Sequence, residues 1–173
     1  MNLANIGVIG AGTMGNGIAQ VCAQAGFDVT LLDIAQGALE KALATIGKNL
    51  DRQVSKGTLG EDDKLAALGR IRISTDYGVL KDAQLVIEAA TENLDLKLKV
   101  LQQIAAQVSA ECVIASNTSS LSITQLAASV SAPERFIGLH FFNPVPVMGL
   151  IEVIRGLQTS DATHALAMDM AQR

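Results

Sequence analysis

The segment Ile6-Gly7-Val8-Ile9-Gly10-Ala11-Gly12-Thr13-Met14-Gly15 carries the pattern that most strongly predicts a fold for this chain. Its first half is a short apolar run of the length expected for a buried strand. The second half places glycines at positions 10, 12 and 15, and the apolar residues after Gly12 recur at helical spacing. A glycine pattern between a strand and an amphipathic helix is typical of a turn that binds phosphate groups.

Each glycine of this turn has a separate predicted purpose. We expect Gly10 to permit the tight turn, Gly12 to let the backbone approach a pyrophosphate, and Gly15 to let helix and strand pack closely. The start of the helix would face the bound anion. A flexible loop without a ligand is the alternative interpretation. The candidate cofactor-binding residues of this turn are Gly10, Ala11, Gly12, Thr13, Met14 and Gly15.

An aspartate at the end of the second predicted strand narrows the choice of cofactor. Asp33 lies about 20 residues beyond the last glycine, where a carboxylate can accept hydrogen bonds from the ribose hydroxyls of an adenine dinucleotide. The same carboxylate would repel a 2′-phosphate, and no arginine follows it at positions 34–36. We therefore expect NAD rather than NADP as the cofactor.

Short apolar runs that suit buried parallel strands alternate along the chain with segments of helical period. The runs are Ile6–Ile9, Val29–Leu32, Leu85–Ile87, Val113–Ala115 and Phe136–Leu139. Helices are predicted at Gln36–Ser55, Glu61–Leu68, Leu94–Val108 and Ile123–Ala128. This alternation predicts an α/β fold: a Rossmann-type, doubly wound, mostly parallel sheet with helices on both faces.

The length of 173 residues suits one domain, so residues 1–173 are predicted to form a single dinucleotide-binding domain. A helical pattern begins after Ser160 and continues to Arg173 without a stop signal. We therefore expect the sequence to be a fragment of a longer protein that ends in or near the start of a helix.

Composition argues against several classes of partner. The formal net charge is −4, without a block of like charges that would favour nucleic acid or an anionic membrane. No apolar run reaches the ~18 residues needed to span a bilayer. The two cysteines, Cys22 and Cys112, form no metal-binding pattern, and Cys22 lies on the apolar face of the first helix. We expect a cytoplasmic protein without a metal site, in which Cys22 belongs to the core.

A histidine and a glutamate late in the chain suit acid–base chemistry. His140 follows the strand Phe136–Leu139, and Glu152 lies in the strand-like segment Leu150–Ile154. If the chain reverses around Pro144–Gly149, the carboxylate returns beside the imidazole at the carboxyl edge of the sheet, where such sheets bind ligands. An imidazole can take the proton of an alcohol while hydride leaves the same carbon. A structural histidine with its hydrogen bonds satisfied is the alternative.

Two further segments carry polar side chains with an open interpretation. The loop Ser116–Ser120 follows a predicted strand at the same sheet edge, where it could contact a ligand or cap the next helix. On the helix Gln36–Ser55 and just beyond it, Lys41, Lys48, Arg52 and Lys56 are spaced to form one basic ridge. A solvated helix face is an equally good interpretation of that ridge.

The segments GAGTMG, Asp33, Glu92-Asn93, SNTSS at 116–120 and HFFNPVPVMGLIEV at 140–153 together resemble the 3-hydroxyacyl-CoA dehydrogenase family. The similarity spans essentially the whole chain and corresponds to the N-terminal, NAD-binding domain of that family. It implies reversible oxidation of a (3S)-3-hydroxyacyl-CoA to a 3-ketoacyl-CoA, with short acyl chains such as 3-hydroxybutyryl-CoA. The family's second, helical domain is absent from this sequence, and in the family it supplies much of a homodimer interface.

The resemblance also implies roles for residues at the reacting carbon. His140 would be the catalytic base, Glu152 would orient it, and Ser119 would hydrogen-bond the substrate oxygen and lie at the cofactor. Asn143 would lie near the nicotinamide. A further active-site asparagine of the family belongs to the helical domain, so the fragment alone could bind NAD without turnover.

Further positions match cofactor and coenzyme A contacts of the family. Glu92 and Lys97 match residues that contact the cofactor. Lys56 matches a lysine that contacts coenzyme A, which would give the basic ridge a ligand. Asn49 stands where the family has a serine that contacts coenzyme A, so that second contact is altered.

Two other functions share the same early motifs. Related β-hydroxyacid and sugar-nucleotide dehydrogenases have the glycine turn and the acidic residue, but they generally use a lysine or cysteine in the reaction. A non-catalytic NAD-binding module would need only the fold. Activity on coenzyme A thioesters separates these alternatives from the predicted enzyme.

Overall fold

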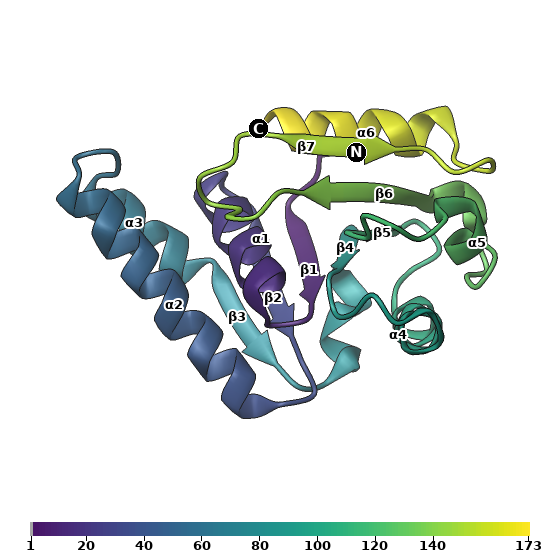
Figure 1. Cartoon of the computed structure of the whole chain (residues 1–173), viewed down its shortest axis with the longest axis horizontal. Coiled ribbons are helices and arrows are strands. Elements are labelled where there is room, and N and C mark those ends of the chain that lie inside the picture. Colours follow the sequence, from purple (N-terminus) through teal and green to yellow (C-terminus); the bar gives the residue numbers. More distant parts are fainter. Residues whose placement is uncertain (1) are drawn as a thin grey trace.

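Strand β1 (Asn5–Ile9) lies inside a sheet that has seven strands within residues 2–173, the part of the chain that the computed structural model describes. The order across the sheet is β3-β2-β1-β4-β5-β6-β7 (Figure 1). All neighbouring strands are parallel except β6 and β7, which are antiparallel. The other strands are β2 (Asp28–Leu32), β3 (Ile71–Ser74), β4 (Leu85–Glu88), β5 (Val113–Ser116), β6 (Phe136–Phe141) and β7 (Ile151–Ile154).

Helices cover both faces of this sheet and form two separate cores with it. The α-helices are α1 (Thr13–Gln24), α2 (Gln36–Ser55), α3 (Glu61–Gly69), α4 (Leu94–Gln107), α5 (Ile123–Ala127) and α6 (Asp161–Gln172). The 3-10 helices are η1 (Tyr77–Asp82) and η2 (Pro133–Arg135). One core joins α1, α2, α3 and α6 to the sheet, and the other joins α4, α5 and η1 (Figure 1).

Alternation of side chains along the strands explains the two cores. In β4, Leu85 and Ile87 belong to the first core, whereas Val86 between them belongs to the second. Successive residues of a strand point to opposite faces, so an unbroken apolar run is what a sheet covered on both sides requires. The predicted doubly wound, mostly parallel fold is therefore confirmed.

Strand β3 and the two 3-10 helices, η1 and η2, were not predicted from the sequence. β3 is a four-residue strand at the end of the sheet, in which Ile71 is buried while Arg72 is exposed. The alternation of apolar and polar residues in β3 is typical of a strand. A run of only four residues directly after a helix is too short for this period to stand out. The predicted helix at Gln36–Ser55 has the bounds of α2, and other predicted boundaries differ by a few residues at most.

The turn between β1 and α1 is closed by backbone contacts. The Gly10 N–H donates to the carbonyl of Leu32 at 2.8 Å, which joins this turn to β2. Gly10 has a φ of +101°, a conformation that L side chains rarely adopt. A Cβ built on Gly15 would lie 1.6 Å from the Gly10 carbonyl oxygen, whereas a Cβ on Gly12 would meet no atom within 4 Å. The close packing of helix and strand that was predicted at Gly15 is therefore present. The space beside Gly12 is open.

Both cysteines are buried and free. Burial raises the pKa of the Cys22 thiol to about 12, and burial likewise raises the pKa of Cys112 to about 12. A thiol with such a pKa is almost never ionised near neutral pH, and the thiolate is the reactive form. Cys22 is a core residue, as its position on the helix predicted.

Gly15→Ala should destabilise the protein far more than Gly12→Ala. The new methyl group at position 15 meets the carbonyl of Gly10, which cannot move without opening the turn, so we expect a loss of at least about 3 kcal/mol. Gly12→Ala should lose no more than about 1 kcal/mol, the usual difference between glycine and alanine at a helix N-cap. Urea unfolding followed by circular dichroism measures both; equal losses would contradict the assignment.

Candidate active site

The carboxyl ends of the parallel strands meet at one edge of the sheet. The strand order reverses between β1 and β4, and ligands bind at this reversal in open α/β sheets. The turn Gly10–Gly15 follows β1, Asp33 follows β2, and the loop Ser116–Ser120 begins at the end of β5. Three chain segments that the sequence separates widely therefore contribute to one edge.

His140 and Glu152 form a hydrogen-bonded pair across two antiparallel strands. They are directly opposite in the register of β6 and β7, and His140 Nδ1 lies 3.0 Å from Glu152 Oε1. An ionised carboxylate only accepts hydrogen bonds, so Nδ1 carries the proton and the lone pair of Nε2 is free to act as a base. The Phe142 ring lies 4.5 Å from the imidazole, centroid to centroid. The predicted chain reversal is confirmed.

Glu92 connects the loop after β4 with the loop after β5. Its carboxylate accepts hydrogen bonds from the Thr118 hydroxyl at 2.8 Å, the Ser120 hydroxyl at 3.2 Å and the Ser119 N–H at 3.4 Å. The Ser119 side chain is exposed, so its hydroxyl is available to a ligand. In the same loop, Asn117 Oδ1 accepts from the Phe141 N–H at 2.8 Å. This bond ties the loop to the strand that carries the histidine.

A groove of about 600 Å³ opens beside the glycine turn. It brings together six of the residues predicted to bind ligands: Ala11, Gly12, Thr13, Asp33, Asn49 and Asn143. Its remaining lining comes from α1, α2, the loop after β4 and the segment after β6: Asn16, Ala38, Lys41, Ala42, Thr45, Ala90, Pro144, Val145 and Pro146.

Asp33 is held in place by two backbone amides. Its Oδ2 accepts from the Ala11 N–H and its Oδ1 from the Ala35 N–H, each at 2.9 Å. A carboxylate has about four lone-pair directions, so acceptor capacity remains for ligand hydroxyls. Burial, and then the charges of Asp33 and Glu88, raise the pKa of Tyr77. That tyrosine therefore stays a neutral phenol next to the carboxylates.

Three further predicted ligand-binding residues differ in their surroundings. The Lys97 side chain is only 2% exposed, and its ammonium is paired with Glu88 at 2.7 Å. Lys56 is exposed directly after α2, outside the lining of the groove. Asn49 lines the groove, and its side-chain amide donates to Gln20 of α1 at 3.1 Å.

The sequence analysis missed the buried partners of this edge. Glu88 ends β4 with no exposed surface, and Gln20 is equally buried in α1. The position of Glu88 at the end of an apolar strand could have indicated a buried ion pair, because a buried charge needs a partner. The identity of that partner was not readable, since contacts across the fold leave no local pattern.

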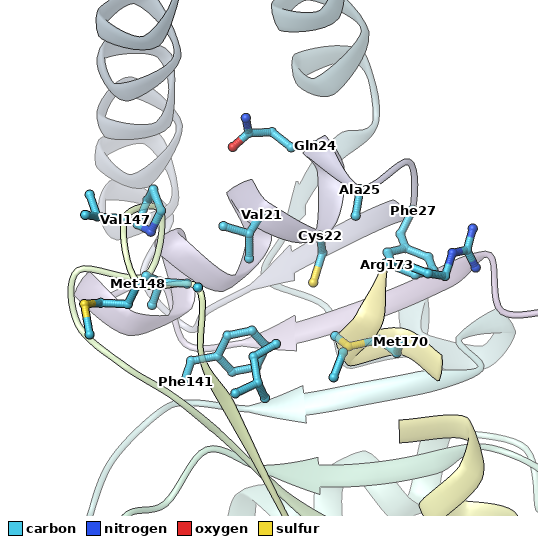
Figure 2. A pocket seen from close by; sticks show the side chains of 15 residues that line it. Val21, Cys22, Gln24, Ala25, Phe27, Phe141, Val147, Met148, Met170 and Arg173 are labelled. Carbon is cyan, nitrogen blue, oxygen red and sulfur yellow. The ribbon is translucent and has the colours of Figure 1, made fainter. Parts of the chain in front are cut away.

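A second cavity, of about 410 Å³, is mainly apolar (Figure 2). Val145 and Pro146 line both this cavity and the groove, so that segment forms a wall of each. In Figure 2, Phe141 and Met170 lie across the space from α1. No histidine, aspartate or glutamate side chain is among the described lining residues of this cavity.

The residues around the groove fit a dinucleotide. Space beside Gly12 leaves its backbone open to a phosphate, and among the described residues no side chain caps the N-terminus of α1. Helix N-termini bind anions through such free N–H groups. With the carboxylate of Asp33 and the hydrogen-bonded His140–Glu152 pair at the same edge, this arrangement defines a dinucleotide-binding α/β domain.

Comparison with known proteins identifies the family. Residues 5–173 match the family described as 3-hydroxyacyl-CoA dehydrogenase, NAD binding domain. The chain belongs to this family, as the motifs of the sequence predicted.

Individual relatives agree with that assignment. A 3-hydroxybutyryl-CoA dehydrogenase of Bradyrhizobium diazoefficiens is 52% identical over 99% of this chain and 58% of its own length. A probable 3-hydroxybutyryl-CoA dehydrogenase of Deinococcus radiodurans is 47% identical over 96% of this chain and 60% of its own length. The crystal structure of (S)-3-hydroxybutyryl-CoA dehydrogenase from Ralstonia eutropha superposes with a TM-score of 0.97 at 56% identity, covering 99% of this chain and 60% of that one. The chain thus spans about three fifths of the length of these relatives.

Gly12→Ala should weaken NADH binding without a matching loss of stability. The methyl group fills the space that a pyrophosphate needs, so we expect at least a tenfold loss of affinity, about 1.4 kcal/mol. Titration calorimetry with NADH measures the change. Gly69→Ala is the control, because a Cβ there also meets nothing within 4 Å but lies on α3, outside the groove. Unchanged NADH affinity in Gly12→Ala would contradict the placement of the phosphates.

Proposed function

We propose that residues 1–173 form the NAD-binding domain of a longer NAD-dependent 3-hydroxyacyl-CoA dehydrogenase; Met1 lies outside the described residues. The enzyme would oxidise a (3S)-3-hydroxyacyl-CoA to the 3-ketoacyl-CoA and catalyse the reverse, with short substrates such as 3-hydroxybutyryl-CoA and acetoacetyl-CoA. Its central support is the in-register His140–Glu152 pair, with 3.0 Å between Nδ1 and Oε1, at the sheet edge that carries the groove. The curated relatives named above support the substrate class.

In this proposal His140 removes the proton of the substrate's 3-hydroxyl group. Nε2 accepts the proton while the hydroxyl oxygen forms its double bond to C3, and Glu152 stabilises the imidazolium that results. The exposed hydroxyl of Ser119 donates a hydrogen bond to the same oxygen. When bound, NAD accepts the hydride that leaves C3. Reduction of the ketone follows the same steps in reverse.

Other residues of the edge would hold the ligands. We assign Asn143, which lines the groove, to the nicotinamide end, and Glu92 to the cofactor side of the two loops that it joins. Lys56 and Asn49 would contact coenzyme A, whose phosphates suit a basic surface. Lys41 lines the groove, and Lys48, Arg52 and Lys56 continue along exposed positions of α2 and its end.

Assembly and location complete the proposal. We assign homodimer formation to the part of the full-length protein that this chain lacks, and its location to the cytoplasm, where free thiols such as Cys22 and Cys112 stay reduced. Within residues 2–173 no helix has both the length and the apolar character needed to cross a bilayer.

His140→Gln in the full-length protein should lower turnover by about 10²- to 10⁴-fold while NADH affinity stays the same, because a general base is lost and the groove is not. The assay is NADH oxidation by acetoacetyl-CoA, followed at 340 nm. His164→Gln, which changes the other histidine of the chain on α6, is the matched control and should turn over normally. Near-normal turnover of His140→Gln would refute the assignment, and NADH binding without any wild-type turnover would favour a binding module.

Glu152→Gln in the same protein should keep the fold and lose rate. Without the carboxylate, the imidazolium that forms at His140 loses its ionic partner, so we expect oxidation to slow by about tenfold or more. The initial rate of 3-hydroxybutyryl-CoA oxidation measures this loss, and circular dichroism checks the fold. A wild-type rate would count against the pair.

NADH should bind at least about tenfold more tightly than NADPH, because Asp33 repels a 2′-phosphate and accepts hydrogen bonds from the free ribose hydroxyls. Asp33→Asn should reduce this ratio of affinities, because it should weaken the binding of NADH and strengthen the binding of NADPH. Asp28→Asn, at the exposed start of the same strand, is the control. Calorimetric titration with both nucleotides decides the matter, and tighter binding of NADPH by the wild-type chain would contradict the prediction.

A further inference from the structure

Three polar side chains are buried together behind the candidate active site. Glu88 and Ser116 have no exposed surface and Lys97 is 2% exposed. They come from the ends of the neighbouring strands β4 and β5 and from α4. A buried ion pair is weak support for stability, because a well-packed apolar replacement is often as stable. The cluster therefore calls for an explanation beyond folding.

The hydrogen bonds of this cluster leave Lys97 without a free donor. Its ammonium donates to both carboxylate oxygens of Glu88, at 2.8 and 2.7 Å, and to Ser116 Oγ at 3.5 Å. An ammonium has three N–H groups, and these three acceptors match them. Lys97 thus serves as the counter-charge of Glu88.

Glu88 and Ser116 also hold the backbone of two ligand-facing loops. Glu88 Oε1 accepts from the Ala90 N–H at 2.9 Å, and Ala90 lines the groove. The Ser116 hydroxyl donates to Glu88 Oε2 at 2.8 Å, while its oxygen accepts from the Thr118 N–H at 3.3 Å. The first loop continues to Glu92 and the second to Ser119. One buried carboxylate is thus bonded to the start of both loops.

The loop after β4 also contacts the glycine turn. A Cβ built on Gly10 would lie 2.7 Å from the Ala89 carbonyl oxygen and 2.8 Å from the Ala90 Cα. The backbone after Glu88 is therefore packed directly against the turn that faces the phosphates. A shift of this segment would move the groove wall and the Ser119 loop together.

We propose that Glu88 is a positioning residue: with Lys97 and Ser116 it sets the relative position of the glycine turn and of the loops that carry Glu92 and Ser119. The role rests on the proposed dehydrogenase function. Lys97 then contributes to cofactor and substrate alignment through Glu88, without touching the cofactor. Alignment of reacting groups is sensitive, since a displacement of about 1 Å can lower the rate about 100-fold.

Two variants of the full-length protein test the cluster without leaving a lone buried charge. Ser116→Ala removes the hydroxyl between Glu88 and Thr118 and changes no charge. The double variant Glu88→Gln/Lys97→Met removes both charges at once, which avoids the penalty of an unpaired buried ion. The charge-matched control is Asp95→Asn/Lys99→Met, an exposed acidic and basic residue on the same helix α4.

We expect kcat for acetoacetyl-CoA reduction to fall by about 10- to 100-fold in both cluster variants, with a smaller change in KM. Circular dichroism should show folded proteins, and the control should keep the wild-type kcat. Wild-type kcat in both folded cluster variants would overturn the proposal. If only the double variant loses NADH affinity while Ser116→Ala behaves as wild type, Lys97 contacts the cofactor and the positioning role is likewise overturned.

Amide hydrogen exchange supplies a readout that does not depend on turnover. We expect the Ala90 and Thr118 amides to exchange faster in the cluster variants than in the control, because their acceptors are altered or lost. Unchanged exchange at both amides would overturn the positioning role even if kcat falls. A wild-type protein without turnover would refute the proposed function alone, and exchange would still decide whether the cluster holds the loops.

Discussion

The carbonyl oxygen of Gly10 lies where a side chain on Gly15 would have to be, since a Cβ there would come within 1.6 Å of it. Glycine at position 15 has no Cβ and so avoids this clash. The start of α1 can therefore pack directly against the end of β1. The free amides at the start of α1 are thereby placed beside the groove. From the same turn, the Gly10 N–H donates to the Leu32 carbonyl and the Ala11 N–H donates to Asp33, so the start of α1 and the end of β2 share one backbone support.

The candidate reacting centre is joined to this turn by side chains and not by the sheet alone. Asn117 ties the loop after β5 to Phe141, next to the histidine, and Glu92 ties that loop to the loop after β4. On the other side, the segment after β6 packs on α1, where a Cβ on Gly17 would lie 2.7 Å from the Val145 side chain. These contacts explain how parts of one edge, drawn from five strands, can keep a common geometry.

Two glutamates at this edge differ through their surroundings. The side chain of Glu152 is 52% exposed and bonds to one imidazole, so it can respond to the charge of that ring. Glu88 is fully buried, and Lys97, Ser116 and a backbone amide satisfy its oxygens. An ion held that firmly suits positioning, whereas a half-exposed carboxylate with a single imidazole partner is less constrained.

Patterns of consecutive residues were enough to predict the β1–α1–β2 unit, the spacing from the glycine turn to Asp33, the class of the fold and the reversal that brings Glu152 to His140. Each of these follows from local periodicity, from glycine and proline positions, or from a single turn. Three other features became known from the packed chain: β3 completes the sheet, Asn49 bonds to Gln20, and Lys97 is buried against Glu88. Those outcomes depend on which surfaces the packed sheet brings together: the free energy of a buried charge is set by its neighbours in space, and no spacing along the chain specifies them.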